Sequence, residues 1–99
     1  MRLGRVVGTV VSTIKVDALT GHKLMLVANV DPSAPQGQTG GGDVYVATDL
    51  AGAGEGDIVL VTLGSAARTA ETTSGVPTDA TIVGIIDSVQ YDNKTTFSK

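Results

Sequence analysis

The residues of this chain that could do chemistry are concentrated in residues 52–68, which read GAGEGDIVLVTLGSAAR. The glycine loop that opens this segment invites comparison with phosphate-binding loops. A P-loop needs a lysine after its last glycine, whereas here Gly56 is followed by Asp57, whose charge would repel a phosphate. A dinucleotide-binding glycine loop opens a helix, but this loop precedes an apolar, strand-like run. The glycines therefore indicate positive-φ turns or close backbone contacts and no bound cofactor.

Nucleophilic catalysis would have to combine Ser65 with His22, the chain's one histidine. A serine nucleophile needs a general base within hydrogen-bonding reach. His22 follows Gly21 in a turn between two strand-like runs, where a solvated imidazole is the ordinary case. No GxSxG motif surrounds Ser65. We therefore assign no catalytic residue and expect that the chain is not an enzyme.

A metal site is also not indicated by the sequence. The chain has no cysteine and one histidine, and its carboxylates are scattered. Their spacing matches neither a zinc site nor an EF-hand calcium loop. We expect no metal ion.

Arg68 follows ten uncharged residues, 58–67, and has two open interpretations. In the last turn of a short helix, a positive charge interacts favourably with the helix dipole. Arginine is also enriched at protein–protein interfaces, so Arg68 could instead bond to a neighbouring subunit. The residue alone does not separate these roles.

Short strands must position these residues, because valine, isoleucine and threonine dominate the apolar runs while glycine and proline punctuate them. We expect a first strand that bends at Gly8 and forms a hairpin with the second, and a fourth strand that is buried on both faces. Ser65 is expected to cap one short helix, residues 65–70. The five expected strands are residues 2–16, 23–30, 44–49, 58–63 and 80–91.

These elements predict an all-β fold, a small five-stranded antiparallel barrel that resembles the oligonucleotide/oligosaccharide-binding (OB) fold, with one short helix. Residues 1–91 would form the single barrel domain. Residues 31–43, with two prolines and four glycines, are expected to be a mobile surface loop. Residues 92–99 would be a polar C-terminal tail. Within it Phe97 either frays with the chain end or docks on a neighbouring subunit.

Composition constrains the partners. Only 17% of the 99 residues are charged, against about 25% in a typical domain, which suggests that much of the surface faces other protein. The net charge of −3 argues against nucleic-acid binding, which relies on lysine and arginine. No apolar run is long enough to span a membrane, and no secretory signal is evident. We expect a cytoplasmic oligomer.

Four segments resemble, in the same order along the chain, the pentameric vertex proteins of bacterial microcompartments, which include carboxysome and ethanolamine-utilisation shell proteins. These segments are LGRVVGTVVSTIK, LTGHKLMLV, GAGEGDIVLVTLGSAAR and PTDATIVGIID. The resemblance implies a barrel related to the OB fold, assembled as a homopentamer at the vertices of a polyhedral shell beside hexameric shell proteins. The family often has glutamate where this chain has Asp57, and the 31–43 loop is longer than the family pattern implies.

The resulting hypothesis places the glycine loop and the short helix at the subunit interface or pore. Its candidate residues are Gly52, Ala53, Gly54, Glu55, Ser65 and Arg68. The alternative is an OB-type binding module for single-stranded nucleic acid or oligosaccharide, which would need a basic groove and stacking aromatics. The mass of the assembly in solution separates the two hypotheses.

Overall fold

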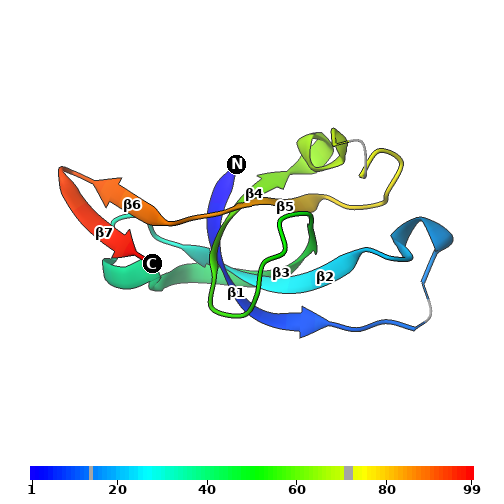
Figure 1. Ribbon diagram of the computed structural model, residues 1–99, viewed down its shortest axis with the longest axis horizontal. Helices are drawn as coiled ribbons and strands as arrows, with labels where there is room; N and C mark the ends of the chain where they lie inside the picture. Colours follow the sequence, from blue (N-terminus) through cyan, green and yellow to red (C-terminus); the bar gives the residue numbers. More distant parts are fainter. Residues whose placement is uncertain (14, 71–72) are drawn as a thin grey trace.

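The computed structural model describes residues 1–13, 15–70 and 73–99 (Figure 1). Strands dominate this part of the chain, and its helices are short 3₁₀ turns, labelled η. In chain order the elements are β1 (Arg2–Val10), η1 (Asp17–Leu19), β2 (Lys23–Val30), η2 (Pro35–Gly37), β3 (Thr39–Asp49), β4 (Ile58–Leu63), η3 (Gly64–Arg68), β5 (Ala80–Ile85), β6 (Ser88–Tyr91) and β7 (Lys94–Ser98). No helix among these elements is long and apolar enough to cross a membrane.

Five strands close into a barrel in the order β1-β2-β3-β5-β4, with β4 pairing back onto β1. The first and second strands form the predicted antiparallel hairpin. The predicted bounds of the second and fourth strands, 23–30 and 58–63, are confirmed. The all-β barrel of five strands is therefore as expected from the sequence.

The prediction that every neighbouring pair is antiparallel is wrong, because β3 and β5 run parallel. They pair at Thr48 with Thr81 and at Asp49 with Ile82. The reason is geometric: strand direction cannot alternate all the way round a closed ring that has an odd number of strands. At least one neighbouring pair must be parallel, and the β3–β5 junction takes that role.

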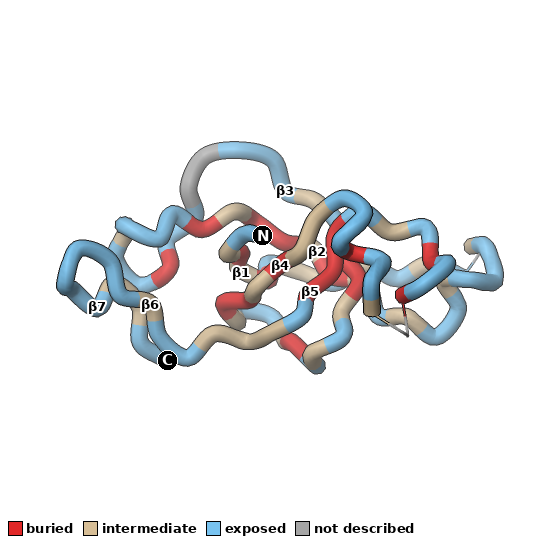
Figure 2. The backbone as a smooth tube through the Cα atoms, turned by 90° about the horizontal axis from the view of Figure 1, so that it is seen from above, coloured by how far each residue is buried: buried red, intermediate tan, exposed pale blue. Residues whose placement is uncertain are grey.

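The core fills the barrel interior, where the buried residues gather in Figure 2. Side chains alternate in and out along each strand, so Met25 and Val27 of β2 are fully buried while Leu24 and Leu26, which alternate with them, are only half-buried. The prediction that the fourth strand is buried on both faces holds only at its start, where Ile58 and Val59 are both buried. Beyond them the strand alternates, because Val61 is buried while Leu60 and Thr62 are half-buried. The buried cluster comprises Val6, Met25, Val27, Ala47, Ala53, Val59, Val61, Ala80 and Ile82.

The first strand bends close to the predicted place and ends earlier than predicted. Its register with β2 shifts between Val6 and Gly8, and a bulge of this kind bends and twists a strand. The strand ends at Val10 instead of Val16, and Ile14 lies outside the described residues. Beyond Val10 the chain leaves the barrel toward the turn that leads to β2 (Figure 1).

The expectation of an irregular loop through residues 31–43 is wrong in its second half. Residues 31–38 contain only turns and η2, but β3 begins at Thr39 and includes the three glycines that follow it. Thr39 pairs with Val30 across an irregular register. The next pair is Val44 with Ala28, so the glycines lie in the irregular stretch between the two pairs.

The C-terminal region also differs from the prediction. The expected strand 80–91 is two strands, because β5 pairs inside the barrel whereas β6 leaves it to pair with β7. Residues 94–98, predicted to lie in a polar tail, form β7. Asp92 and Asn93 link β6 and β7 with φ values of +52° and +61°. Two positive φ values at the centre of a two-residue loop are typical of a type I′ hairpin turn.

Candidate functional site

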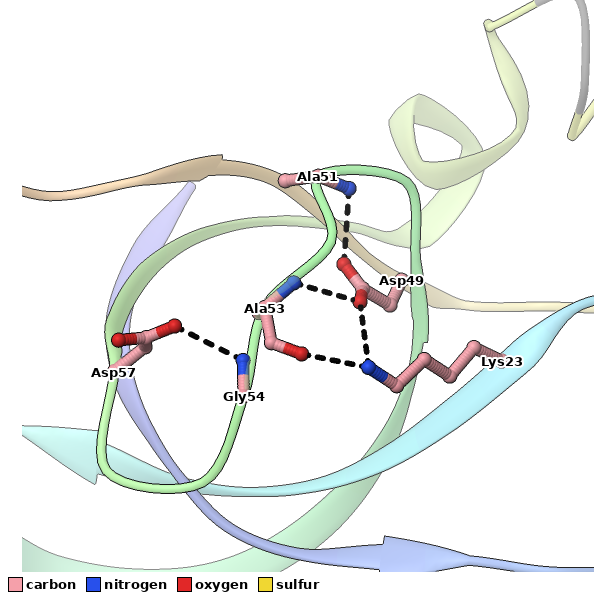
Figure 3. A network of polar contacts seen from close by, with 6 residues as sticks. All are labelled: Lys23, Asp49, Ala51, Ala53, Gly54 and Asp57. Carbon is pink, nitrogen blue, oxygen red and sulfur yellow. Dashed lines mark hydrogen bonds and ion pairs between the residues drawn. The ribbon is translucent and has the colours of Figure 1, made fainter.

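The glycine loop, residues 50–57, is folded around the carboxylate of Asp49 at the end of β3 (Figure 3). The Asp49 side chain is only 1% exposed. Its Oδ1 accepts a hydrogen bond from the Ala51 N–H at 2.9 Å, and its Oδ2 accepts one from the Ala53 N–H at 2.9 Å. An aspartate at a strand end that bonds the next backbone amides is a common way to start a turn.

Lys23 at the start of β2 completes this network. Its Nζ donates to the Ala53 carbonyl at 2.8 Å and lies 3.8 Å from Asp49 Oδ2. Because the Lys23 side chain is 53% exposed, the ion pair itself adds little stability. The Lys23 ammonium still places a positive charge near the buried, negatively charged Asp49 carboxylate.

Asp57 closes the other side of the loop. Its Oδ2 accepts from the Gly54 N–H at 2.9 Å. The Gly56 N–H donates to the Val6 carbonyl at 2.8 Å, and the Val6 N–H donates to the Asp57 carbonyl at 3.0 Å. The amides of Ala51, Ala53, Gly54 and Gly56 are therefore engaged within the chain. The loop carries its own carboxylates where a phosphate-binding loop would carry its ligand.

The loop glycines serve backbone conformation within the subunit. Gly52 and Gly56 have φ values of +76° and +89°, which side-chain-bearing residues rarely adopt. A Cβ at either position would meet no atom within 4 Å, and one at Gly54 would reach only Asp57 Oδ2, at 3.9 Å. Close packing within the chain occurs elsewhere, at Gly37, where a Cβ would lie 2.7 Å from Ile58 Cδ1.

Ser65 and Arg68 lie on η3, at the far end of β4 from the loop. The prediction of a helix capped by Ser65 is wrong: η3 is a 3₁₀ helix whose N-cap position is Leu63, and no side chain caps it. It is held to β5 by the buried Thr81 hydroxyl, which donates to the Ala67 carbonyl at 2.7 Å. The helix begins directly after the strand at Gly64, whose φ is +62°.

Arg68 makes a contact within its own chain, because its Nη1 donates to the Thr78 carbonyl at 2.8 Å. The side chain is exposed, so the rest of the guanidinium can reach a neighbouring molecule. Of the other candidate residues, Gly52, Glu55 and Ser65 are exposed, and Gly54 is half-buried. Ala53 is buried in the core cluster. The loop and η3 are thus two separately anchored segments at either end of β4.

Sequence reasoning missed Arg5, whose guanidinium ties three segments together. Its Nε donates to Gly37 O at 3.2 Å, Nη1 to Gly56 O at 3.0 Å and Nη2 to Gln36 O at 2.9 Å. One side chain on β1 thereby holds both η2 and the glycine loop. A cation between Gly4 and Val6 of an apolar strand was the available signal, since arginine can bond several carbonyls at once.

The histidine and the serine that were considered for catalysis lie on different segments of the structure. In the part of the chain that the structure describes, no group of three or more His, Asp or Glu side chains gathers to hold an ion. His22 lies in the turn before β2, whereas Ser65 is on η3.

Burial raises the pKa of the Tyr45 phenol above its ordinary value, and the positive charge of Arg2 partly offsets this rise. The Tyr45 hydroxyl is buried without a hydrogen-bond partner.

The sequence model of one protein family, described as ethanolamine utilisation protein EutN/carboxysome, matches residues 1–87. The chain belongs to the EutN/CcmL family. Among its relatives is the bacterial microcompartment shell vertex protein GrpN of Rhodospirillum rubrum, 44% identical over 94 residues that cover 94% of this chain and all of GrpN. The predicted resemblance to microcompartment vertex proteins is therefore confirmed.

Solved structures of EutN/CcmL family members agree in fold. The CcmL of Gloeobacter violaceus superposes with a TM-score of 0.90 at 41% identity, covering 100% of this chain and 98% of that one. The pentameric microcompartment shell protein GrpN from Rhodospirillum rubrum has a TM-score of 0.78 at 42% identity, covering 94% of this chain and 100% of GrpN. The barrel described above is thus the fold of the family.

Proposed function

We propose that this chain is a structural shell protein that forms homopentamers at the vertices of a polyhedral bacterial microcompartment. One observation carries the proposal: a pentameric microcompartment shell protein aligns along its whole length with this chain at 42% identity. Other relatives are named as carboxysome or microcompartment shell vertex proteins. On this proposal the chain is located in the shell, its neighbours there are hexameric shell proteins, and it has no catalytic role.

The surface supports assembly into a ring. A cyclic ring built from one kind of chain uses two different patches of each subunit. Three valines on the outside of the barrel strands, Val44, Val46 and Val83, are 53%, 44% and 42% exposed. Burial of such side chains between subunits supplies a hydrophobic driving force for association.

We assign the candidate residues of the glycine loop and η3 to this ring interface or its pore. The exposed members, Gly52, Glu55, Ser65 and Arg68, would face the neighbouring subunit. The buried Ala53 would act indirectly, since its N–H and carbonyl both hold the loop in shape. The rigid loop suits this role, because an ordered surface loses little conformational entropy on association.

The closed five-stranded barrel is proposed to be a relative of the OB fold, without the nucleic-acid binding of many OB domains. Such binding uses stacking aromatics in a basic groove. The ring of Tyr45 instead packs against the barrel core, and the chain carries a net charge of −3. These observations favour an assembly role over the alternative of a binding module.

Light scattering or native mass spectrometry of the full chain tests the proposal. The expected mass is five times the 10.0-kDa chain. Arg68→Glu is expected to lower the pentamer fraction, with Arg2→Glu, on exposed Arg2 of β1, as the matched control. A monomer that binds single-stranded nucleic acid with steep salt dependence would overturn the proposal. If the Arg68→Glu variant is fully pentameric, only the assignment of Arg68 to the interface is wrong, and the pentamer stands.

A further inference from the structure

Two of the three aromatic residues in this chain lie outside the barrel. Tyr45 packs against the core, whereas Tyr91 is on β6 and Phe97 on β7. Aromatic side chains supply much of the apolar contact in small cores and are enriched at interfaces. Their placement on the β6–β7 hairpin points to a contact that a single subunit does not complete.

The apolar residues of the hairpin share one face. Val89 pairs with Phe97 directly across the two strands. Tyr91 is two residues beyond Val89 on β6, so it projects on the same side. Tyr91 is 51% exposed, and Val89 and Phe97 are half-buried. We refer to Val89, Tyr91 and Phe97 as the hairpin face.

The hairpin projects from one end of the molecule, opposite the β1–β2 turn (Figure 1). Its two strands form their own sheet, separate from the barrel. It is attached to the segment around η2 by two hydrogen bonds: the Thr96 hydroxyl donates to Pro32 O at 2.8 Å, and the Ser98 N–H donates to Gln36 Oε1 at 3.3 Å. A two-stranded hairpin alone is only marginally stable in water, so a surface that covers its apolar face would stabilise it.

An apolar surface of matching character lies on the outside of the barrel. Leu26 of β2 and Val46 of β3 are direct cross-strand partners. They point outward because their neighbours Met25, Val27 and Ala47 are buried in the core. We refer to this patch as the β2–β3 outer face; it consists of Leu24, Leu26, Val44 and Val46.

We propose that the hairpin face of one subunit packs on the β2–β3 outer face of the next subunit in the ring. This inference rests on the proposed pentamer. A closed ring of identical chains requires two different complementary patches, and a projecting aromatic hairpin and an aliphatic sheet face form such a pair. The occupant of the outer face is therefore a second copy of this chain, and each subunit both gives and receives a hairpin.

The absence of cysteine from the sequence allows a direct test with introduced disulfides. The full-length double variant Val46→Cys/Tyr91→Cys is oxidised and run on a non-reducing denaturing gel. A disulfide requires Cα atoms within about 7 Å, so a ladder of linked chains that extends to five is expected. The matched control is Val83→Cys/Tyr91→Cys, because Val83 of β5 is as exposed as Val46 but lies outside the β2–β3 outer face. It is expected to give no ladder.

The outcomes separate this inference from the proposed function. Pentamers by light scattering that give no ladder, a disulfide confined within one chain, or an equal ladder in the control would overturn the hairpin contact and leave the shell assignment intact. A wild-type chain that is monomeric overturns the pentamer and the hairpin contact with it.

A second measurement does not depend on disulfide geometry. The double variant Tyr91→Ser/Phe97→Ser is expected to raise the protein concentration needed for half-assembly at least about tenfold, since loss of a buried interface aromatic commonly weakens binding by that factor or more. Val16→Ser, at a 58% exposed valine that belongs to neither face, is the control and should leave assembly unchanged. Equal assembly of the aromatic variant and the control would contradict the inference.

Discussion

The glycine loop and the β6–β7 hairpin are both outside the barrel strands, yet they are attached to the barrel in opposite ways. The loop has no regular structure, but two carboxylates, a lysine and strand β1 all bond to its backbone. The hairpin is regular β structure, but it is attached through two hydrogen bonds to the segment around η2. The irregular segment is therefore the better anchored of the two.

This difference shows that secondary structure and rigidity are separate properties. A loop is fixed when its backbone polar groups find partners inside the subunit, as the amides of Ala51 and Ala53 do on Asp49. A hairpin satisfies its own backbone, so it can leave the barrel and present side chains elsewhere. The loop is suited to keep a fixed shape at an interface, whereas the hairpin is suited to reach across one.

The largest expected effect comes from removal of the loop's central anchor. Asp49→Ala deletes a buried carboxylate that accepts two backbone N–H bonds, so we expect a loss of about 3 kcal/mol in the free energy of unfolding. Chemical denaturation at a fixed protein concentration measures it. Asp43→Ala, at an exposed aspartate of β3, is the control and should change stability by less than about 0.5 kcal/mol. Equal effects from the two variants would show that the loop is not anchored through Asp49.

Arg5 connects the two regions, since it bonds the loop at Gly56 and the hairpin's attachment site at Gln36 and Gly37. Lysine has a single nitrogen and cannot span these three carbonyls. We expect Arg5→Lys to cost about 2 kcal/mol and to speed hydrogen exchange both at the Gly56 amide and at the Ser98 amide. Arg2→Lys is the control on the same strand. Faster exchange in the loop alone would mean that the hairpin is held independently of Arg5.

The strand pattern of this chain predicted the barrel well because β4 and β2 are nearly uninterrupted apolar runs. The parallel β3–β5 pair could also have been derived, since five strands in a closed ring cannot all be antiparallel. The hairpin had a local signal that went unused: Asp92 and Asn93 are residue types that adopt the positive φ of a type I′ turn. The polarity of the surrounding residues concealed it.

The anchoring of the glycine loop was less accessible from the sequence. The sequence indicated that Asp57 would repel a phosphate, but the bond of Asp57 to Gly54 depends on the folded path of the loop. Arg5 and Lys23 reach partners more than 25 positions away, at Gly37 and Ala53. Contacts at that separation follow from barrel closure, which local patterns do not encode. Local patterns likewise do not encode which residues of a neighbouring subunit Arg68 would contact in an assembled ring.

The glycines of the loop give a graded test of its fixed conformation. Gly52→Ala and Gly56→Ala place a side chain at positive φ, so each is expected to cost about 1–2 kcal/mol. Gly54→Ala is the matched control in the same loop, because Gly54 lacks a positive φ and a Cβ there would make ordinary contact. Its expected change is near zero, measured by the same denaturation. A comparable loss at Gly54 would indicate that close packing, and not backbone conformation, governs all three positions.

The smallest expected effect lies in the hairpin turn, and it tests whether the β6–β7 hairpin is less firmly attached to the barrel than the glycine loop. Asn93 has φ +61°, and glycine is the favoured residue at the second position of a type I′ turn. Asn93→Gly should therefore stabilise the hairpin by about 0.5 kcal/mol. The measurement is slower hydrogen exchange at the backbone amide of Lys94, which pairs with Tyr91 across the hairpin. Because the hairpin is weakly attached, it can open without the barrel, and the global unfolding free energy should not change.

Asn29→Gly on β2 is the control, expected to lower global stability instead, since glycine weakens a strand interior. An equal rise in global stability and hairpin protection with Asn93→Gly would show that hairpin and barrel unfold as one unit, which removes the distinction between the two regions.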